Sequence, residues 1–493
     1  MQTHSYPPVN RTALLTVLCS AALYLIFSAV MANHYYIHSD EVQSVDRGLN
    51  LYYHGRYVTN AHRYFYDFDF AVSSSILNDA VVYTWAKLFG GSLAAIRFLS
   101  YLLAAATAIL FWRFAARTRV AENSAIAALL APIALFSGPM YMSWRYHRYD
   151  LSGMVVVALL YYVLSLAPGR RKFALLLFSA MLLPFAGLQH IAYAGLIGIF
   201  ALVFRLFKFK DVLPAVFGGA IGVAAYAFLL ASLGQLNNFV ENVIFPKQIS
   251  SLEQGYWDSL VHSVFNNWMN NLLMAGCGIG LLWGVVKRNG ELVRTGAAGL
   301  AIAMIIPLFF AGLLGHFTRW YAWMPFFPLS YLYIRLLDKA RPQRPLFYAL
   351  CGFLLCSLLL PLPLMLAKTL LEYKETHYGS VERFVAERLP PDKRVFSDVY
   401  AYYPAMELSE AVYLRDDVLD VMSESDRNAI DCAILTKMNE DQTAVDMTLQ
   451  KLGGTWKPAG ELKVRRSALR QKIPIDSKEK YVYHLVIYER DKP

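Results

Sequence analysis

Long apolar runs alternate with short polar connections along most of the chain. A helix needs about 20 apolar residues to cross the hydrocarbon core of a bilayer, and about eleven runs approach this length. The pattern predicts a polytopic bundle of transmembrane helices. The runs lie near residues 12–32, 93–115, 122–142, 151–167, 172–189, 191–207, 212–233, 263–286, 296–314, 319–337 and 346–367.

Basic residues fall in every second connection between these runs. Cytoplasmic loops of membrane proteins carry an excess of Lys and Arg, so these connections are predicted to face the cytoplasm. The other connections then face outward, and an odd number of spans places the C-terminal tail outside as well. The basic connections are 113–119, 170–172, 205–210, 287–294 and 335–344, and the outward segments include 33–92, 143–150, 234–262 and 315–318.

Residues 76–90 are apolar enough to resemble another span, but their pattern is amphipathic. Asp79, Tyr83 and Lys87 recur at four-residue spacing opposite an apolar stripe. A further span here would reverse the sidedness of every later basic connection. We therefore expect an interfacial helix within the first outer loop, residues 33–92.

The composition changes to that of a soluble domain from about residue 370. The predicted fold is therefore mainly α, with a transmembrane domain over residues 1–369 and a small extracytoplasmic α/β domain over 370–493. One helix and three strands are predicted in the second domain, over 381–389, 394–399, 431–436 and 481–488.

Composition supports a membrane protein, since 57% of the residues are hydrophobic, 17% are charged and the mean hydropathy is +0.37. The net charge of +10 arises from clusters at the ends of apolar runs, which leaves no extended basic face for a nucleic acid. The first run lacks a small-residue cleavage site, so we expect a retained helix. Four of the five cysteines lie in apolar runs, so neither a disulfide framework nor a zinc site is predicted.

Two adjacent carboxylates, Asp40 and Glu41, directly follow the first apolar run. Ser39 before them is predicted to be the N-cap of a short interfacial helix. The acids then have two interpretations. They can complement the positive end of that helix, or one of them can be a general base that activates an acceptor hydroxyl.

Other polar clusters fall in the outward segments. Each can be an interfacial anchor, because Arg and Tyr often hold helix ends at the membrane surface. Their location on one predicted side of the membrane instead favours a shared site. The candidates are His62, Arg63, Tyr64, Asp67 and Asp69 in the first outer loop; Arg145, His147, Arg148 and Asp150 in WRYHRYD (144–150); His190; Lys247; and His316 and Arg319 in GHFTRWY (315–321).

Four features resemble the GT-C superfamily of integral-membrane glycosyltransferases, in particular the branch that contains protein O-mannosyltransferases and aminoarabinose lipid A transferases. The resemblance covers most of the chain. It departs from the lipid A transferases at 73–76, where SSSI replaces a Glu-Lys-Pro-type motif, so their substrate preference is not carried over. The matching features are Asp40-Glu41 after the first run, AKLFGGSLAAIR (86–97), RYD (148–150) and FVAERLPPDKRV (384–395).

The resemblance implies roles for three acids. The first outer-loop carboxylate is the catalytic base in that family, which corresponds to Asp40 with Glu41 as its partner. An acid of the second outer loop contributes to the same cavity, which corresponds to Asp150.

An outward-facing transferase has no pool of nucleotide sugars, so its donor is expected to be a sugar on a lipid carrier. The carrier phosphate needs cations or hydrogen-bond donors as it leaves. The predicted function is inverting transfer from a polyprenyl-phosphate sugar to a hydroxyl of a lipid, glycan or protein, at the outer, periplasmic face of a bacterial inner membrane. The phosphate ligands are expected among Arg145, His147, Arg148, His316 and Arg319, with Lys247 closing over the donor.

Two other functions stay open. An O-antigen ligase or polymerase also uses lipid-linked donors and outer Arg and His residues, although such proteins usually lack a soluble C-terminal domain. A transporter would be expected to carry ionisable residues at the bilayer midplane and two related halves, whereas the ionisable residues here lie mostly at the ends of the runs.

Asp67 and Asp69 form an Asp-x-Asp pair of the kind that binds divalent cations. Two acids alone are a weak signal, because hard cations need several oxygen ligands. We therefore expect no required metal or other cofactor, with a divalent cation as the alternative.

Overall fold

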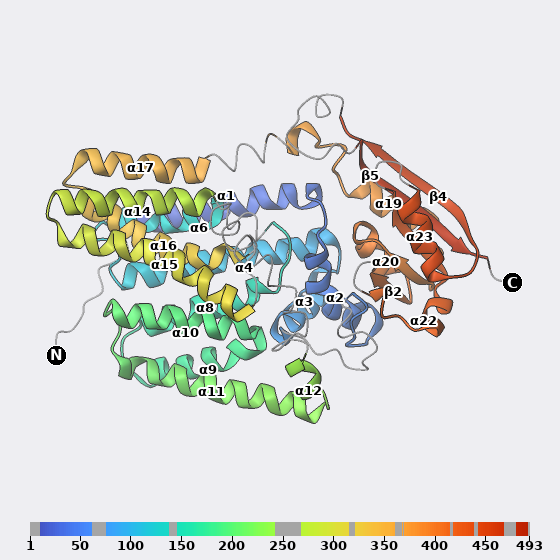
Figure 1. Cartoon of the computed structure of the whole chain (residues 1–493), viewed down its shortest axis with the longest axis horizontal. Coiled ribbons are helices and arrows are strands. Elements are labelled where there is room, and N and C mark those ends of the chain that lie inside the picture. The colour runs from blue at the N-terminus through green and yellow to red at the C-terminus, as the bar shows by residue number, and fades with distance from the viewer. Residues whose placement is uncertain are drawn as a thin grey trace. The chain divides into compact units, whose positions relative to one another are not determined.

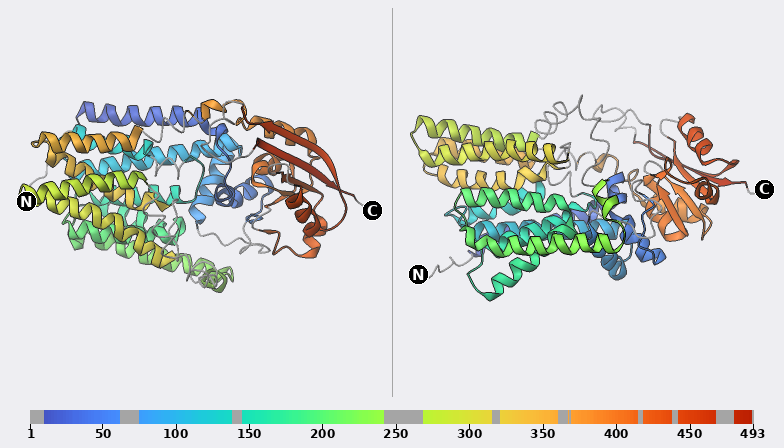
Figure 2. Two further views of the ribbon diagram at one scale, coloured as in Figure 1. Left: turned by 45° about the horizontal axis from the view of Figure 1, so that its top comes forward. Right: turned by 60° about the horizontal axis from the view of Figure 1, so that its bottom comes forward.

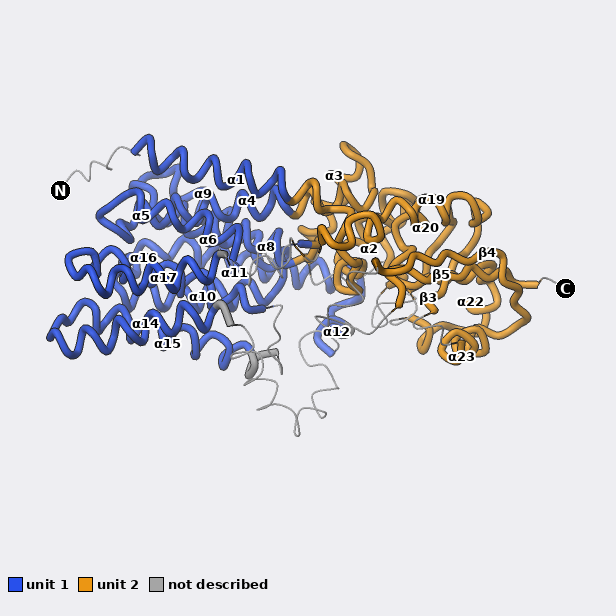
Figure 3. The backbone as a smooth tube through the Cα atoms, turned by 90° about the horizontal axis from the view of Figure 1, so that it is seen from above, with its two compact units in different colours: residues 1–27, 101–145, 150–364 blue, residues 28–100, 146–149, 365–493 orange. Residues whose placement is uncertain are grey.

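The computed structural model describes residues 10–61, 75–137, 145–241, 268–314, 321–359, 367, 369–414, 418–437, 442–467 and 480–491. The chain forms two compact units (Figure 3). This grouping differs from the boundary expected at residue 370, because the first outer loop belongs with the C-terminal segment. Unit 1 is Met1–Phe27, Tyr101–Arg145 and Asp150–Leu364, and unit 2 is Ser28–Ser100, Tyr146–Tyr149 and Met365–Pro493.

Unit 1 is a bundle of apolar helices (Figure 1). Each predicted apolar run forms helix in its described part, and the run at 122–142 is divided into two short helices near Leu129. The helices are α1 (Arg11–Met31), α4 (Leu93–Arg117), α5 (Ser124–Ala128), α6 (Leu130–Phe136), α8 (Asp150–Leu164), α9 (Arg170–Ala186), α10 (Leu188–Val203), α11 (Phe209–Ser232), α12 (Leu236–Phe239), α14 (Trp268–Val286), α15 (Gly290–Leu314), α16 (Trp323–Ala340) and α17 (Arg344–Leu359). The first residues of α4 and the last residues of α1 belong to unit 2.

By length and composition, four described segments can cross a membrane: Arg11–His34, Leu93–Arg117, Phe209–Ser232 and Gly290–Phe310. Large apolar side chains such as Phe228 are exposed on these helices, as expected for a surface in contact with lipid. The chain is therefore an integral membrane protein. The count of about eleven spans stays a prediction.

Helices α9 and α11 approach closely at two glycines. A Cβ atom on Gly218 would lie 2.3 Å from the carbonyl oxygen of Leu177, and one on Gly222 would lie 2.5 Å from that of Met181. Small residues one helical turn apart allow this backbone contact, as in other membrane helix pairs.

In unit 2, α2 (Ser39–His54) begins directly after the first apolar helix and a 3₁₀ turn, η1 (Ala32–His34). Its N-cap is His38, whose Nδ1 accepts a hydrogen bond from the Asp40 N–H at 3.2 Å. The expected cap at Ser39 is therefore wrong by one residue. Histidine is not among the usual capping residues, which is why the sequence pattern missed it.

Helix α3 (Ile76–Phe89) packs against α2 and matches the helix predicted over 76–90. The polar residue Asp79 is buried on the α2 side, whereas Leu88 and Phe89 are 69% and 60% exposed. The charged residue of α3 thus faces the protein interior, and the apolar residues at the end of α3 face outward. An exposed apolar end suits a helix at a membrane interface.

The C-terminal part of unit 2 is an α/β domain with a five-stranded sheet in the order β2-β1-β3-β5-β4 (orange to red in Figure 2). Strand β1 pairs in parallel with β2 and β3, and β5 pairs in antiparallel fashion with β3 and β4. The strands are β1 (Arg394–Ser397), β2 (Ala411–Leu414), β3 (Cys432–Thr436), β4 (Trp456–Arg465) and β5 (Tyr481–Arg490), and the helices are α19 (Gly379–Arg388), η5 (Val399–Ala401), α20 (Tyr402–Leu408), α22 (Glu424–Ala429) and α23 (Thr443–Leu452).

The predicted helix and three predicted strands correspond to α19, β1, β3 and β5. The strand pattern missed β2 and β4. Only four residues form β2, and β4 is an edge strand rich in Lys, Glu and Arg. Charged edge strands of this kind resist pairing with other chains, so they lack the apolar alternation by which strands are predicted.

Hydrogen bonds join the first outer loop to the C-terminal segment within unit 2. The Tyr378 N–H donates to the Asn33 carbonyl at 2.9 Å, and the Leu414 N–H donates to the Asn60 carbonyl at 3.1 Å. These two backbone bonds, together with the buried bond from Tyr402 Oη to Asp46 Oδ1, explain why the two segments form one unit.

Candidate active site

Asp40 lies in the first turn of α2 and is the accessible member of a group of acids in unit 2. Its side chain is 33% exposed, and its Oδ2 accepts a hydrogen bond from Arg148 Nη1 at 3.0 Å. The Arg148 side chain is itself only 3% exposed. A buried cation therefore orients a carboxylate that solvent or a substrate can still reach.

Glu41, the next residue, is completely buried and paired with Arg97. The guanidinium donates from Nε to Oε1 at 2.8 Å and from Nη2 to Oε2 at 2.7 Å. Arg97 also donates to the carbonyls of Ala32, Tyr35 and Tyr36 at 2.6, 2.9 and 3.1 Å. This bidentate pair fixes the start of α2 to the chain that leaves α1, and neither oxygen of Glu41 is open to a substrate.

His147 lies in a fully buried position between α3 and α4. Its Nδ1 is 2.8 Å from Ser100 Oγ, and its Nε2 is 3.0 Å from Asn78 Oδ1. Because the Asn78 amide donates to the Ser44 carbonyl at 2.7 Å, Oδ1 is the accepting atom and the His147 proton is assigned to Nε2. Burial lowers the pKa of His147 to about 3, so the ring is neutral. Both of its nitrogens bond to buried protein groups, Ser100 and Asn78.

Asp46, one and a half turns after Asp40, is also completely buried. Its Oδ1 accepts from Tyr402 Oη at 2.6 Å. Its Oδ2 accepts from Thr59 Oγ1 at 2.8 Å and from the N–H groups of Asn60 and Ala61 at 2.9 and 3.2 Å. Burial raises the pKa of Asp46, and the bonds from Tyr402 and Thr59 oppose this effect.

Asp79 is the third buried acid of this group. Its Oδ2 accepts from Arg47 Nε at 2.9 Å and from Tyr57 Oη at 2.5 Å. Glu41, Asp46 and Asp79 are thus each held inside the protein. Among the described acids of α2 and α3, Asp40 is the one with an accessible carboxylate.

Three of the predicted residues that the structure describes, Arg145, Asp150 and His190, lie in unit 1. Asp150 begins α8. The His190 ring is 3.2 Å from the Asp150 carbonyl oxygen through Nε2 and stacks against Trp323. A Cβ atom on Gly153 would lie 2.3 Å from this ring, so the contact requires glycine. The Arg145 carbonyl accepts from Tyr101 Oη at 3.0 Å. Asp150 and His190 are therefore neighbours in unit 1.

The remaining predicted residues lie outside the described part of the chain. Within the described part, no group of three or more His, Cys, Asp or Glu residues could hold a metal ion. The question of a divalent cation at the Asp-x-Asp pair therefore stays open. The residues outside the described part are His62, Arg63, Tyr64, Asp67, Asp69, Lys247, His316 and Arg319.

Sequence reasoning did not single out Arg97, although a signal was present. It is an isolated arginine near the start of an apolar run, and ionisable residues in such positions generally pair with another group or mark a site. Tyr402 gave no comparable signal, because it is 356 residues from its partner Asp46 and lies in a segment for which no element was predicted.

No protein-family model matches the chain, and a search of curated proteins found no match. Two of the solved structures that are similar to it are compared here by identity and coverage. One is a crystal structure of ArnT from Cupriavidus metallidurans bound to undecaprenyl phosphate, with 12% identity, a TM-score of 0.45 and coverage of 96% of this chain and 97% of that chain.

The other is a crystal structure of the Archaeoglobus fulgidus oligosaccharyltransferase in the apo form. It has 11% identity and a TM-score of 0.45, over 96% of this chain and 76% of that chain. Both belong to the GT-C class that the sequence motifs resemble. At this identity the likeness concerns the fold alone, so the function is argued below from the residues of the chain.

Proposed function

We propose that the chain is a membrane glycosyltransferase that moves a sugar from a polyprenyl-phosphate donor to an acceptor hydroxyl, with Asp40 as general base. The accessibility of Asp40 carries this proposal. The buried acids Glu41 and Asp79 are engaged by arginines, whereas Asp40 combines an orienting arginine with an exposed edge. A general base needs both an accessible oxygen and a fixed orientation.

The proposed reaction is a single in-line displacement. The acceptor hydroxyl gives its proton to Asp40 while its oxygen bonds to the anomeric carbon of the sugar. On the opposite face, the bond between that carbon and the phosphate oxygen breaks, and the carrier phosphate keeps the bonding electrons. The product therefore has the inverted configuration at the anomeric carbon.

The neighbours of Asp40 are assigned supporting roles. Arg148 orients the base through the 3.0 Å bond to Oδ2, and Glu41 with Arg97 fixes the helix turn that carries it. His147 supports α3 and α4 from its buried position, since its ring nitrogens face Ser100 and Asn78. The departing phosphate still requires cations, for which Arg145, Lys247, His316 and Arg319 remain the candidates, with Asp150 and His190 as further cavity residues.

The donor class follows from the predicted sidedness. Asp40 follows the first apolar helix, in a loop that the positive-inside rule places outside. A donor on that face must be carried by a lipid. We therefore place the reaction at the outer face of a bacterial cytoplasmic membrane, with a lipid, glycan or protein as acceptor.

A donor panel tests this function. The full-length protein, purified in detergent, is incubated with radiolabelled polyprenyl-phosphate hexoses and pentoses and a membrane extract as acceptor source. We expect label to leave at least one donor and to appear in a new product, with Asp40→Asn as the inactive reference.

Two results would contradict the proposal. Intact donors throughout the panel would contradict sugar transfer from these donors. Equal donor consumption by the Asp40→Asn protein would contradict the role of Asp40 as general base. Movement of an intact labelled lipid across reconstituted vesicles without sugar transfer would instead identify a transporter, and polymerised or ligated glycan from a lipid-diphosphate donor would identify the ligase class.

A further inference from the structure

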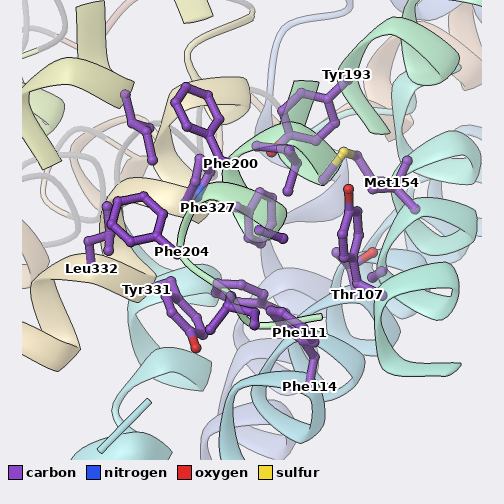
Figure 4. Close-up of a pocket in the computed structure, with 18 of the residues that line it drawn as sticks. Thr107, Phe111, Phe114, Met154, Tyr193, Phe200, Phe204, Phe327, Tyr331 and Leu332 are labelled. Carbon is purple, nitrogen blue, oxygen red and sulfur yellow. The ribbon is translucent and has the colours of Figure 1, made fainter. Parts of the chain in front are cut away.

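Unit 1 contains an apolar pocket with an empty volume of about 800 Å³, including its open part. Figure 4 shows aromatic side chains around this space. Its wall comes from helices α4, α8, α10, α15 and α16. The aromatic lining includes Phe111, Phe114, Phe200, Phe204 and Phe327.

The tyrosines that line the pocket turn their hydroxyls to protein partners. Thr107, which also lines it, donates to the Leu103 carbonyl of its own helix at 2.9 Å. The wall therefore presents hydrocarbon and ring faces to an occupant. A polar ligand would lose its hydrogen bonds to water there, which costs free energy. The tyrosine bonds are Tyr161 Oη to the Ala194 carbonyl at 2.5 Å, Tyr193 Oη to the Met324 carbonyl at 2.9 Å, and Tyr331 Oη with Thr118 Oγ1 at 2.9 Å.

One end of the pocket is different. Arg335 is the charged member of the described lining residues. It follows Phe327 by eight residues on α16, which is about 12 Å along a helix axis. Arg335 also begins the basic connection 335–344, predicted to face the cytoplasm. The pocket thus combines a long apolar wall with a cation at the predicted cytoplasmic end.

We propose that this pocket binds one acyl chain of an anionic phospholipid from the cytoplasmic leaflet, with the headgroup phosphate at Arg335. The chain satisfies the apolar wall, and guanidinium binds phosphate with two parallel hydrogen bonds. Basic pockets between membrane helices on the cytoplasmic side are known to take anionic headgroups. A polyprenyl donor would present its phosphate at the outer face, so the phospholipid fits this end better. The proposal does not depend on the sugar-transfer function.

A photolabelling experiment tests it. The full-length protein is placed in phosphatidylcholine nanodiscs that contain a trace of phosphatidylglycerol with a diazirine near the end of one acyl chain. After irradiation, labelled peptides are mapped by mass spectrometry. We expect label on wall residues of α4, α8 and α10. The same diazirine chain on a choline headgroup should give about fivefold less label, because the choline cation cancels the phosphate charge that a basic side chain attracts in a net anionic lipid.

Four variants separate a bound lipid from the surrounding bilayer. Ala201→Phe fills the pocket and should remove the label, and Arg335→Gln should abolish the preference for phosphatidylglycerol over phosphatidylcholine. Arg171→Gln makes the same charge change at an exposed position of the same predicted face and should leave both unchanged. Ala158→Leu is a milder filling variant, used if Ala201→Phe does not migrate as a folded protein.

Two outcomes would overturn the proposal. Equal labelling from the two headgroups, unaffected by filling the pocket, would mean that only bilayer lipid contacts the helices. Loss of label on addition of undecaprenyl phosphate, with no loss on addition of unlabelled phosphatidylglycerol, would assign the pocket to the carrier lipid.

Discussion

The acid cluster of unit 2 and the aromatic pocket of unit 1 both lie among packed helices, but they are built from different groups. In the cluster, Glu41 is buried with a bidentate arginine, and Asp46 is buried under four hydrogen bonds. In the pocket, even the hydroxyls of the lining tyrosines bond to other protein groups.

The difference follows from the cost of burying polar groups. A buried charge must be paired with good geometry or it destabilises the fold, so the cluster is rigid and directional. An apolar pocket does not require a fixed geometry of its contacts, because hydrophobic contact is non-directional. The cluster therefore suits a reaction that depends on orientation, whereas the pocket suits a ligand held mainly by its chain.

The largest expected effect concerns the one accessible acid of the cluster. Asp40→Asn keeps the shape and the bond from Arg148 but removes the basicity, so sugar transfer should fall by about 10²–10⁴-fold. Donor binding should survive, because the shape of the side chain is kept. Asp420→Asn, an exposed acid paired with Lys451 in the same unit, is the control and should keep full activity. Near-normal transfer by Asp40→Asn would move the base to another residue.

The buried pair at Glu41 should matter for folding instead of chemistry. Arg97→Met leaves an uncompensated carboxylate inside the protein, which should cost about 3–5 kcal/mol of stability. Thermal unfolding in detergent measures the loss. Lys339→Met, which removes a cation from partly exposed surface pairs with Glu122 and Glu291, should lower the unfolding temperature much less, because solvent screens these charges.

A double variant sharpens this comparison. Glu41→Leu combined with Arg97→Met removes both charges, and replacement of a buried pair by apolar residues is often neutral or stabilising. The double variant should thus be more stable than Arg97→Met alone. If the two variants unfold at the same temperature, the pair is not the source of the stability.

The sequence pattern predicted these two regions to different extents. The apolar runs that build the pocket repeat over long stretches, so their helices were predicted, and Asp40 was predicted from its place after the first run. The partners inside the cluster were not predicted. Glu41 and Arg97 are 56 residues apart, and Asp46 and Tyr402 are brought together only by folding.

The pocket itself also had no sequence signal. Its wall residues lie on five helices, and which faces of those helices meet is decided by side-chain packing. Periodicity cannot show this for helices that are apolar on all sides. Two other features, by contrast, could have been predicted from the sequence. A lone Arg97 within an apolar run indicates a buried partner, and a charged segment such as β4 is typical of an edge strand.

The next effect is a pH dependence that originates in the cluster. Burial lowers the pKa of His147 from 6.5 to about 3, so the unfolded chain protonates this ring at a higher pH than the folded protein does. The stability that the folded protein gains from a neutral His147 is complete above pH 6.5. This stability is lost as the pH falls towards 3. At pH 5 the loss should be about 2 kcal/mol.

Unfolding of the wild type and of His147→Gln at pH 7 and pH 5 measures this contribution. The wild type should lose more stability than the variant between these two pH values. An unchanged pH dependence in His147→Gln would show that the ring is protonated equally in the folded and unfolded states.

The smallest expected effect belongs to the pocket. Tyr161→Phe removes a hydroxyl that bonds to the Ala194 carbonyl at 2.5 Å, so about 1 kcal/mol of stability should be lost. Acyl-chain labelling should stay at the wild-type level, because the ring that faces the pocket is kept and the hydroxyl is not offered to the ligand. The matched change at Tyr193, whose hydroxyl bonds to the Met324 carbonyl, should behave alike. A Tyr161→Phe protein with altered headgroup preference would show that this hydroxyl contacts the ligand, and the pocket would then bind through directional polar groups, as the acid cluster does.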